Sequence, residues 1–191
     1  MEQLRNEIDR LRERVNAQAM EITRLEELSE TDALTGIANR RSFEKELRRR
    51  YSEQQRDGRG FCLMIIDVDG FKGVNDELGH AEGDRLLQSI ANVIESNVRA
   101  SDIVFRIGGD ELAIILPGVK LDQARIAAQR LIELTCSRMR NEIEQAGVGL
   151  SIGLVESNGQ RPIDQLIEAA DRAMYRAKKQ GGSRYLTEDL E

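Results

Sequence analysis

Strand-like and helix-like apolar patterns alternate along residues 39–179 in an order that few folds accommodate. The continuous apolar run Phe61–Ile66 predicts a strand buried on both faces. The runs Ile103–Ile107 and Leu112–Leu116 enclose the letters GGDE and predict a tight hairpin, and a further strand is expected over Val148–Val155. Helices are expected over residues 39–55, capped by Asn39, then over 82–98, 121–143 and 163–179, the last ending at two glycines.

Between the two outer helices the order is β-α-β-β-α-β, with a turn near Gly70 and Gly73 after the first strand. That order is the split βαβ, or ferredoxin-like, arrangement, so the sequence predicts an α+β fold. In such a sheet the first strand lies beside a hairpin strand. Asp67, at the end of the first strand, can therefore converge with Asp110 and Glu111 at the hairpin tip.

The first thirty residues contain neither Gly nor Pro and repeat apolar residues every seven positions. One series is Met1, Ile8, Val15 and Ile22, and the other is Leu4, Leu11, Gln18 and Leu25. β-branched residues in the first series and Leu in the second favour a parallel two-stranded coiled coil. An amphipathic helix lying on its own domain is the alternative. We expect a dimeric coiled coil over residues 1–30 and one catalytic domain over 31–191.

Composition narrows the class of partner. The formal net charge of -6 argues against a nucleic-acid-binding surface, which needs a basic stripe, but it leaves room for a small anionic ligand. No apolar run approaches the length of a membrane span, so no membrane contact is expected. Cys62 and Cys136 lack metal-ligand spacing and lie in apolar stretches, which predicts buried, reduced thiols in a cytoplasmic protein.

The three acids Asp67, Asp110 and Glu111 predict a metal site. Buried like charges repel one another unless a cation intervenes. A hard divalent ion bound by carboxylate and phosphate oxygens removes that conflict and can support displacement at phosphorus. Asp67 or Asp110 taken alone is better explained as a turn residue, since Asp is common in turns. The two groups together on one fold favour the metal.

These residues and the segments around them resemble the GGDEF family of diguanylate cyclases. Residues 106–112 (RIGGDEL) are similar to the family's signature turn, and the resemblance extends over residues 32–184. Four further blocks match in the family's order: 32–41 (DALTGIANRR), 67–84 with DVDGFKGVND at its start, 151–153 (SIG) and 170–178 (ADRAMYRAK). The resemblance implies a palm-type nucleotidyl cyclase domain that condenses two GTP into cyclic di-GMP, releases two pyrophosphates and acts as a homodimer behind a sensor domain.

The resemblance also implies residue roles. Asp67, the main-chain carbonyl of Val68 and Asp110 would hold Mg²⁺, for which Mn²⁺ could substitute. Asp110, with Glu111 as a second candidate, would activate the ribose 3′-hydroxyl. The implied substrate-binding residues are Asn75 and Asp84 at the guanine edge, His80 at the substrate, and Lys72 and Lys178 at the triphosphate. Without the resemblance, Asp84 would be a first-turn helix acid, His80 a capping or surface residue and each lysine a solvated one.

Arg99 and Asp102 match the family's RxxD inhibitory site for bound cyclic di-GMP, although a helix-end Arg and a turn Asp would look the same. Two positions depart from the family pattern. Leu112 replaces the usual Phe at a packing position. Gly182 stands where many members carry a phosphate-clamping Arg, a role that Arg184 could take.

Three other functions remain open from the sequence. The domain could bind GTP or cyclic di-GMP without turnover, or it could be inert while the coil recruits a partner. It could also use ATP as well as GTP, although Asp84 favours guanine. The reaction of the chain with GTP and Mg²⁺ separates these alternatives.

Overall fold

The computed structural model describes residues 30–142, 147–157 and 159–188, together with residues 7, 10–12, 14–16, 18 and 20. It divides into two units, Met1–Glu30 and Thr31–Glu191. In the first unit the described residues up to Met20 are helical, and Leu11 and Val15 are exposed. The heptad positions Met1, Leu4, Ile8, Ile22 and Leu25 lie outside the described residues. No helix in the described part of the chain is long and apolar enough to cross a membrane.

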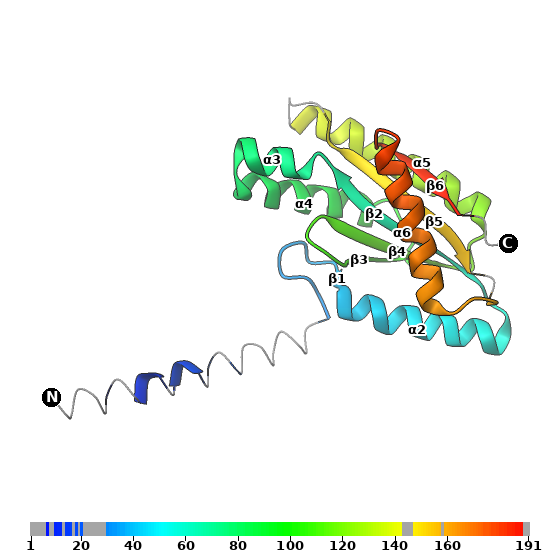
Figure 1. Ribbon diagram of the computed structural model, residues 1–191, viewed down its shortest axis with the longest axis horizontal. Helices are drawn as coiled ribbons and strands as arrows, with labels where there is room; N and C mark the ends of the chain where they lie inside the picture. Colours follow the sequence, from blue (N-terminus) through cyan, green and yellow to red (C-terminus); the bar gives the residue numbers. More distant parts are fainter. Residues whose placement is uncertain are drawn as a thin grey trace. The chain divides into compact units, whose positions relative to one another are not determined.

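The second unit is built on a mixed six-stranded sheet in the order β1-β3-β4-β2-β5-β6 (Figure 1). The strands are β1 (Ala38–Asn39), β2 (Phe61–Asp69), β3 (Ile103–Arg106), β4 (Glu111–Pro117), β5 (Gly149–Ser157) and β6 (Arg184–Thr187). The central strands are antiparallel, whereas β1 and β6 add parallel edges to β3 and β5. The predicted ferredoxin-like order is confirmed for the four strands that the sequence predicts, which are β2, β3, β4 and β5.

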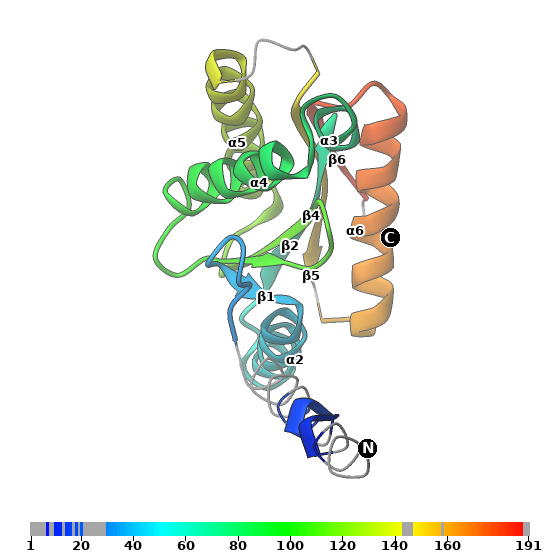
Figure 2. The same ribbon diagram turned by 90° about the vertical axis from the view of Figure 1, so that its left-hand side faces the viewer.

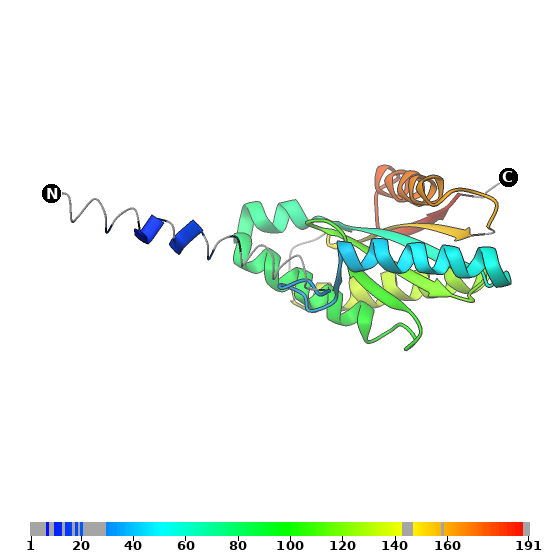
Figure 3. The ribbon, with the colours of Figure 1, turned by 90° about the horizontal axis from the view of Figure 1, so that it is seen from below.

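The helices form a layer on each face of the sheet (Figures 2 and 3). They are α2 (Arg40–Asp57), α3 (Phe71–Leu78), α4 (His80–Glu95), α5 (Leu121–Glu142) and α6 (Ile163–Lys179). One apolar cluster joins α4 and α5 to one side of the sheet, and a second joins α2 and α6 to the other. Because β2 faces both clusters, its apolar run is buried on both faces, as predicted.

Local signals in the sequence fix several boundaries. The Asn39 side chain accepts a hydrogen bond from the Ser42 amide at 3.0 Å and caps α2, as predicted. Two predictions differ from the structure: the expected turn after β2 leads into the helix α3, and the helix expected over residues 82–98 is α4, which runs from His80 to Glu95. Gly70 adopts φ +77 before α3, and a Cβ there would lie 2.8 Å from the Gly147 carbonyl oxygen, so only glycine fits this junction.

The two thiols differ in burial. Cys62 is fully buried in β2, and burial raises the pKa of its thiol to about 12, so it stays protonated and unreactive. Cys136 is half-buried and lies 3.8 Å from the Ser183 hydroxyl, so the prediction of two buried thiols holds only for Cys62. Neither cysteine forms a disulfide.

Candidate active site

Three acids, Asp67, Asp110 and Glu111, lie near one another where the last residues of β2 run beside the start of β4. Asp67 and Glu111 are paired across the two strands, and the Val68 amide donates to the Asp110 carbonyl at 3.1 Å. The hairpin closes through the Ile107 and Gly108 amides, which both donate to the Glu111 carbonyl. The structure therefore brings together the strand-end and hairpin acids that the sequence selected.

The acids share an unfavourable electrostatic environment. Burial, followed by the charges of Asp110 and Asp69, raises the pKa of Asp67 despite a nearby lysine. Burial and then the charges of Asp110, Asp171 and Asp67 raise the pKa of Glu111. Raised carboxyl pKa values mean that the site holds more negative charge than its surroundings stabilise, which is the condition that a bound cation relieves.

The ammonium group of Lys178 supplies positive charge to this site. Its Nζ donates to both carboxylate oxygens of Asp67, at 2.6 and 2.8 Å, across a separation of 111 residues. Partial burial lowers the pKa of Lys178, but the hydrogen bond and the charge of Asp67 raise it overall. The Asp67 side chain is only 9% exposed, whereas that of Lys178 is 47% exposed, so the lysine can leave while the carboxylate stays in place.

The expected guanine-binding residues lie together on α3 and α4. Asn75 projects from α3 against Gly83 of α4, where a Cβ would overlap the amide oxygen of Asn75. Asp84 follows Gly83 and is exposed, as is His80 at the start of α4. Lys72 is exposed in the first turn of α3, directly after the strand that carries Asp67. Asn75 and Asp84 are thus on neighbouring helices, which approach each other closely at Gly83, where only glycine leaves room for the Asn75 side chain.

An ion pair joins the signature hairpin to the start of the domain. Arg106 donates to Asp32 at 3.0 Å and to the Gly109 carbonyl at 2.8 Å. Asp32 also accepts from the amide and hydroxyl of Thr35. Burial raises the pKa of Asp32, but these hydrogen bonds lower it overall. Arg106 therefore holds the backbone next to Asp110.

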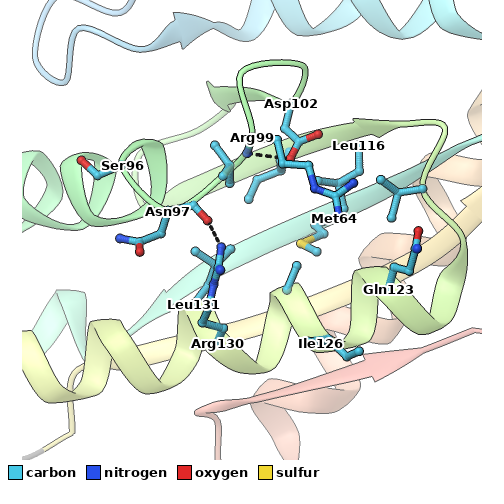
Figure 4. Close-up of a pocket in the computed structure, with 14 residues that line it drawn as sticks. Met64, Ser96, Asn97, Arg99, Asp102, Leu116, Gln123, Ile126, Arg130 and Leu131 are labelled. Carbon is cyan, nitrogen blue, oxygen red and sulfur yellow. Dashed lines mark hydrogen bonds between the residues drawn. The ribbon is translucent and has the colours of Figure 1, made fainter.

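Arg99 and Asp102 lie in the turn between α4 and β3. The Arg99 amide donates to the Asp102 carboxylate at 2.9 Å, and both residues line a cavity of about 410 Å³ (Figure 4). The cavity lies between the end of α4, the sheet and α5. Arg130 of α5 also lines it and donates to the Asn97 carbonyl. The sequence did not single out Arg130, because a lone Arg on a long helix carries no motif.

Comparison with known proteins decides the family. The model for "Diguanylate cyclase, GGDEF domain" matches residues 29–184. The chain belongs to the GGDEF family. The GGDEF domain is 35% identical over 154 residues to diguanylate cyclase DgcS of Shewanella oneidensis, covering 81% of this chain and 51% of that protein. It is 38% identical over 156 residues to diguanylate cyclase DosC of Escherichia coli, covering 80% and 34%.

Solved structures show the same fold. The GGDEF domain of DgcB from Caulobacter crescentus, in complex with c-di-GMP, aligns with a TM-score of 0.78 at 31% identity and covers 83% of this chain and 95% of that one. A longer DgcB structure with the coiled coil and the GGDEF domain gives a TM-score of 0.78 at 30% identity and covers 93% and 99%. The chain spans about half of the length of DgcS and a third of that of DosC.

The donor set of this GGDEF domain fits a hard divalent ion. Asp67 and Asp110 offer carboxylate oxygens and Val68 a carbonyl, which are the ligands that Mg²⁺ prefers. Among the described residues, no three His, Cys, Asp or Glu side chains form a metal-binding group. An ion here would complete its shell with substrate phosphates and water, as Mg²⁺ does at nucleotide sites.

The structure accounts for the two positions, Leu112 and Gly182, at which the sequence departs from the family pattern. Leu112 is 1% exposed in the core, which confirms a packing position. Gly182 adopts φ +69, and a Cβ there would lie 2.6 Å from the Asp69 carboxylate, so the turn cannot take a side chain without moving. The guanidinium of Arg184 donates to the Gly182 carbonyl at 3.1 Å, which keeps it beside this turn.

Proposed function

We propose that this domain condenses two GTP molecules into cyclic di-GMP and releases two pyrophosphates. The observation that carries the proposal is the group formed by Asp67, Asp110 and Glu111, in which Lys178 acts as an exchangeable counter-charge. Membership of the GGDEF family supports the reaction class. Mass analysis of the products formed from GTP and Mg²⁺ tests it, and binding without turnover would favour a sensor instead.

Each acid has a role in the proposed mechanism. Asp67, the Val68 carbonyl and Asp110 would hold Mg²⁺, which when bound supplies positive charge to the phosphates and acidifies the attacking hydroxyl. Asp110 or Glu111 accepts the proton of the 3′-hydroxyl, and the raised pKa of Glu111 suits it to that task. The 3′-oxygen attacks the α-phosphorus of the second GTP, the bond to pyrophosphate breaks, and the same step repeated closes the ring.

The basic residues bind the triphosphate in this mechanism. Lys178 would turn from Asp67 to a phosphate oxygen of bound GTP, and this exchange is open to it because its side chain is 47% exposed. Lys72 approaches from the first turn of α3, whose free amides also favour phosphate. Arg184, next to the turn after α6, is our candidate for the clamp that Gly182 cannot provide.

Guanine selection is assigned to Asn75 and Asp84. A carboxylate accepts hydrogen bonds from N1 and N2 of guanine, and adenine offers neither donor, so the pair selects GTP over ATP. His80 lies at the start of the same helix as Asp84 and is proposed to contact the substrate.

Changing Gly83 to alanine is expected to raise KM for GTP about tenfold with a smaller effect on kcat. The added Cβ overlaps the Asn75 amide and displaces it from the guanine edge, and one lost hydrogen bond of this kind costs about 1.4 kcal/mol. Steady-state kinetics with GTP and ATP measure the change. Gly73→Ala, which meets open space on α3, is the control, and an unchanged KM in Gly83→Ala would contradict the assignment.

The proposed active form is a homodimer joined by the coiled coil over residues 1–30. One domain binds one GTP, so two domains must face each other. The heptad pattern supports the coil, as do the exposed Leu11 and Val15 and the likeness to the coiled-coil structure of DgcB. An upstream sensor would act through this helix, and cyclic di-GMP bound at Arg99 and Asp102 would inhibit the enzyme, with Arg130 as a further contact.

Deleting residues 1–30 is expected to make the specific activity depend on enzyme concentration and to lower it at least about tenfold in dilute enzyme. The coil raises the effective concentration of one domain for its partner, and that advantage is lost with the segment. Product assays over a range of enzyme concentrations, with sedimentation of both forms, measure it. If the shortened chain is equally active at every dilution, the coil has no part in assembly.

A further inference from the structure

The turn that follows α6, residues 181–183, is attached to Asp69 at the end of β2. The Ser183 amide donates to Oδ2 of Asp69 at 2.7 Å. The Ser151 hydroxyl of β5 donates to the other oxygen, Oδ1, also at 2.7 Å. One carboxylate therefore joins three segments that are distant in the sequence. None of the roles proposed above uses Asp69.

Close packing around residues 181–183 fixes the position of this turn relative to Asp69. A Cβ on Gly182 would lie 2.6 Å from Oδ2 of Asp69, and a Cβ on Gly149 would overlap the Ser183 hydroxyl. Ser183 adopts φ +48 and is the one non-glycine residue with a positive φ in the described part of the chain. Such a conformation persists only where the surroundings hold it. The contacts with Asp69 provide that restraint.

The turn is continuous with the helix end that carries Lys178. The Gly182 amide donates to the Ala177 carbonyl at 3.1 Å, and the Gly181 amide donates to the Lys178 carbonyl at 3.2 Å. These two bonds form a Schellman cap, which couples the backbone of the last helical turn to the loop after it. Holding Ser183 therefore also holds the backbone of Lys178.

We propose that Asp69 is a positioning residue that fixes the end of α6 so that Lys178 can reach the GTP triphosphate. Two links join the end of β2 to α6: the ion pair of Lys178 with Asp67, and the hydrogen bond of Ser183 with Asp69. Binding of GTP breaks the first link, because Lys178 then turns to phosphate. The second link keeps the helix end in place, and a charged group that is held in position binds more tightly than a free one. This inference rests on the proposed function.

The test measures binding of 3′-deoxy-GTP, which lacks the attacking hydroxyl, and of GMP to the full chain with Mg²⁺ by calorimetry. Asp69→Ala should weaken 3′-deoxy-GTP about tenfold and leave GMP nearly unchanged, because the loss is confined to the outer phosphates. Asp69→Asn should restore binding, because its amide can accept from Ser183 and donate to Ser151. In the active enzyme, Asp69→Ala should raise KM more than it lowers kcat.

A double-mutant cycle with Lys178→Met separates positioning from a general structural effect. Asp69→Ala should cause no further loss in the Lys178→Met background, because the group that it positions is already gone. Gly182→Ala pushes the turn away from Asp69 from the other side and should reproduce the same loss. It serves as the second variant if Asp69→Ala does not fold.

Several results would overturn the inference. One is equal 3′-deoxy-GTP affinity in wild type, folded Asp69→Ala and Gly182→Ala. A second is an Asp69→Asn variant as weak as Asp69→Ala, which would show that the charge matters and not the hydrogen bonds. A third is an undiminished effect of Asp69→Ala in the Lys178→Met background. A wild-type chain that binds 3′-deoxy-GTP without converting GTP would refute the cyclase alone, and one that binds neither nucleotide would refute both.

Discussion

The Asp110→Asn variant is expected to make cyclic di-GMP at least about a thousand-fold more slowly than wild type. Asp110 lies in the hairpin whose backbone receives the Val68 amide, and its charge raises the pKa of both Asp67 and Lys178, so its carboxylate belongs to the same charged site. An amide keeps the size of the side chain but removes the negative charge that a hard cation requires. A thousand-fold loss corresponds to about 4 kcal/mol of transition-state stabilisation, within the range that metal and charge contacts supply. Product formation from GTP and Mg²⁺ measures it.

A binding measurement separates lost metal binding from lost folding. Mg²⁺ with 3′-deoxy-GTP should raise the melting temperature of the wild-type chain, because a ligand that binds only the folded state stabilises it. The shift should nearly vanish in Asp110→Asn, while its melting temperature without ligand stays within a few degrees of wild type. Asp122→Asn, whose side chain is 90% exposed on α5, is the control. If a folded Asp110→Asn variant turned over GTP at the wild-type rate, the proposed catalytic role of these acids would be wrong.

The central part of this site could be predicted because its signals are local. The apolar run of β2 ends at Asp67, and the two hairpin strands enclose Asp110 and Glu111. Strand order in a β-α-β-β-α-β sheet then brings the two groups together, as the register shows. The strongest periodic signals therefore also position the acids. Leu112, identified as a packing position, is buried for the same reason.

Other features depend on contacts that no window of sequence contains. α3 is only eight residues long and contains Gly73, so its helical pattern was too weak to outweigh the turn signal of the two glycines. β1 has two residues and β6 has four, and both are defined by pairing with β3 and β5. The attachment of Ser183 to Asp69 spans 114 residues. Only the folded chain shows these partners.

The Gly153→Ala variant is expected to destabilise the domain by about 3 kcal/mol or more. Gly153 lies in β5 under α6, where a Cβ would overlap the Ala170 carbonyl oxygen and the Met174 amide. Both partners are backbone atoms, so no change of rotamer relieves the overlap, and α6 must move away from the sheet. For a domain of this size the change lowers the melting temperature by about 10 °C. Thermal and urea unfolding followed by circular dichroism measure it.

The same substitution at Gly73 provides the matched control. A Cβ on Gly73 meets open space, and alanine is favoured over glycine inside a helix by about 1 kcal/mol, so Gly73→Ala should be neutral or slightly stabilising. Moving α6 also moves Lys178, so folded Gly153→Ala should bind 3′-deoxy-GTP more weakly than wild type at a temperature where both are native. If Gly153→Ala has the same melting temperature as wild type, α6 does not pack closely on β5. Packing of α6 on β5 would then not be what positions Lys178 beside Asp67.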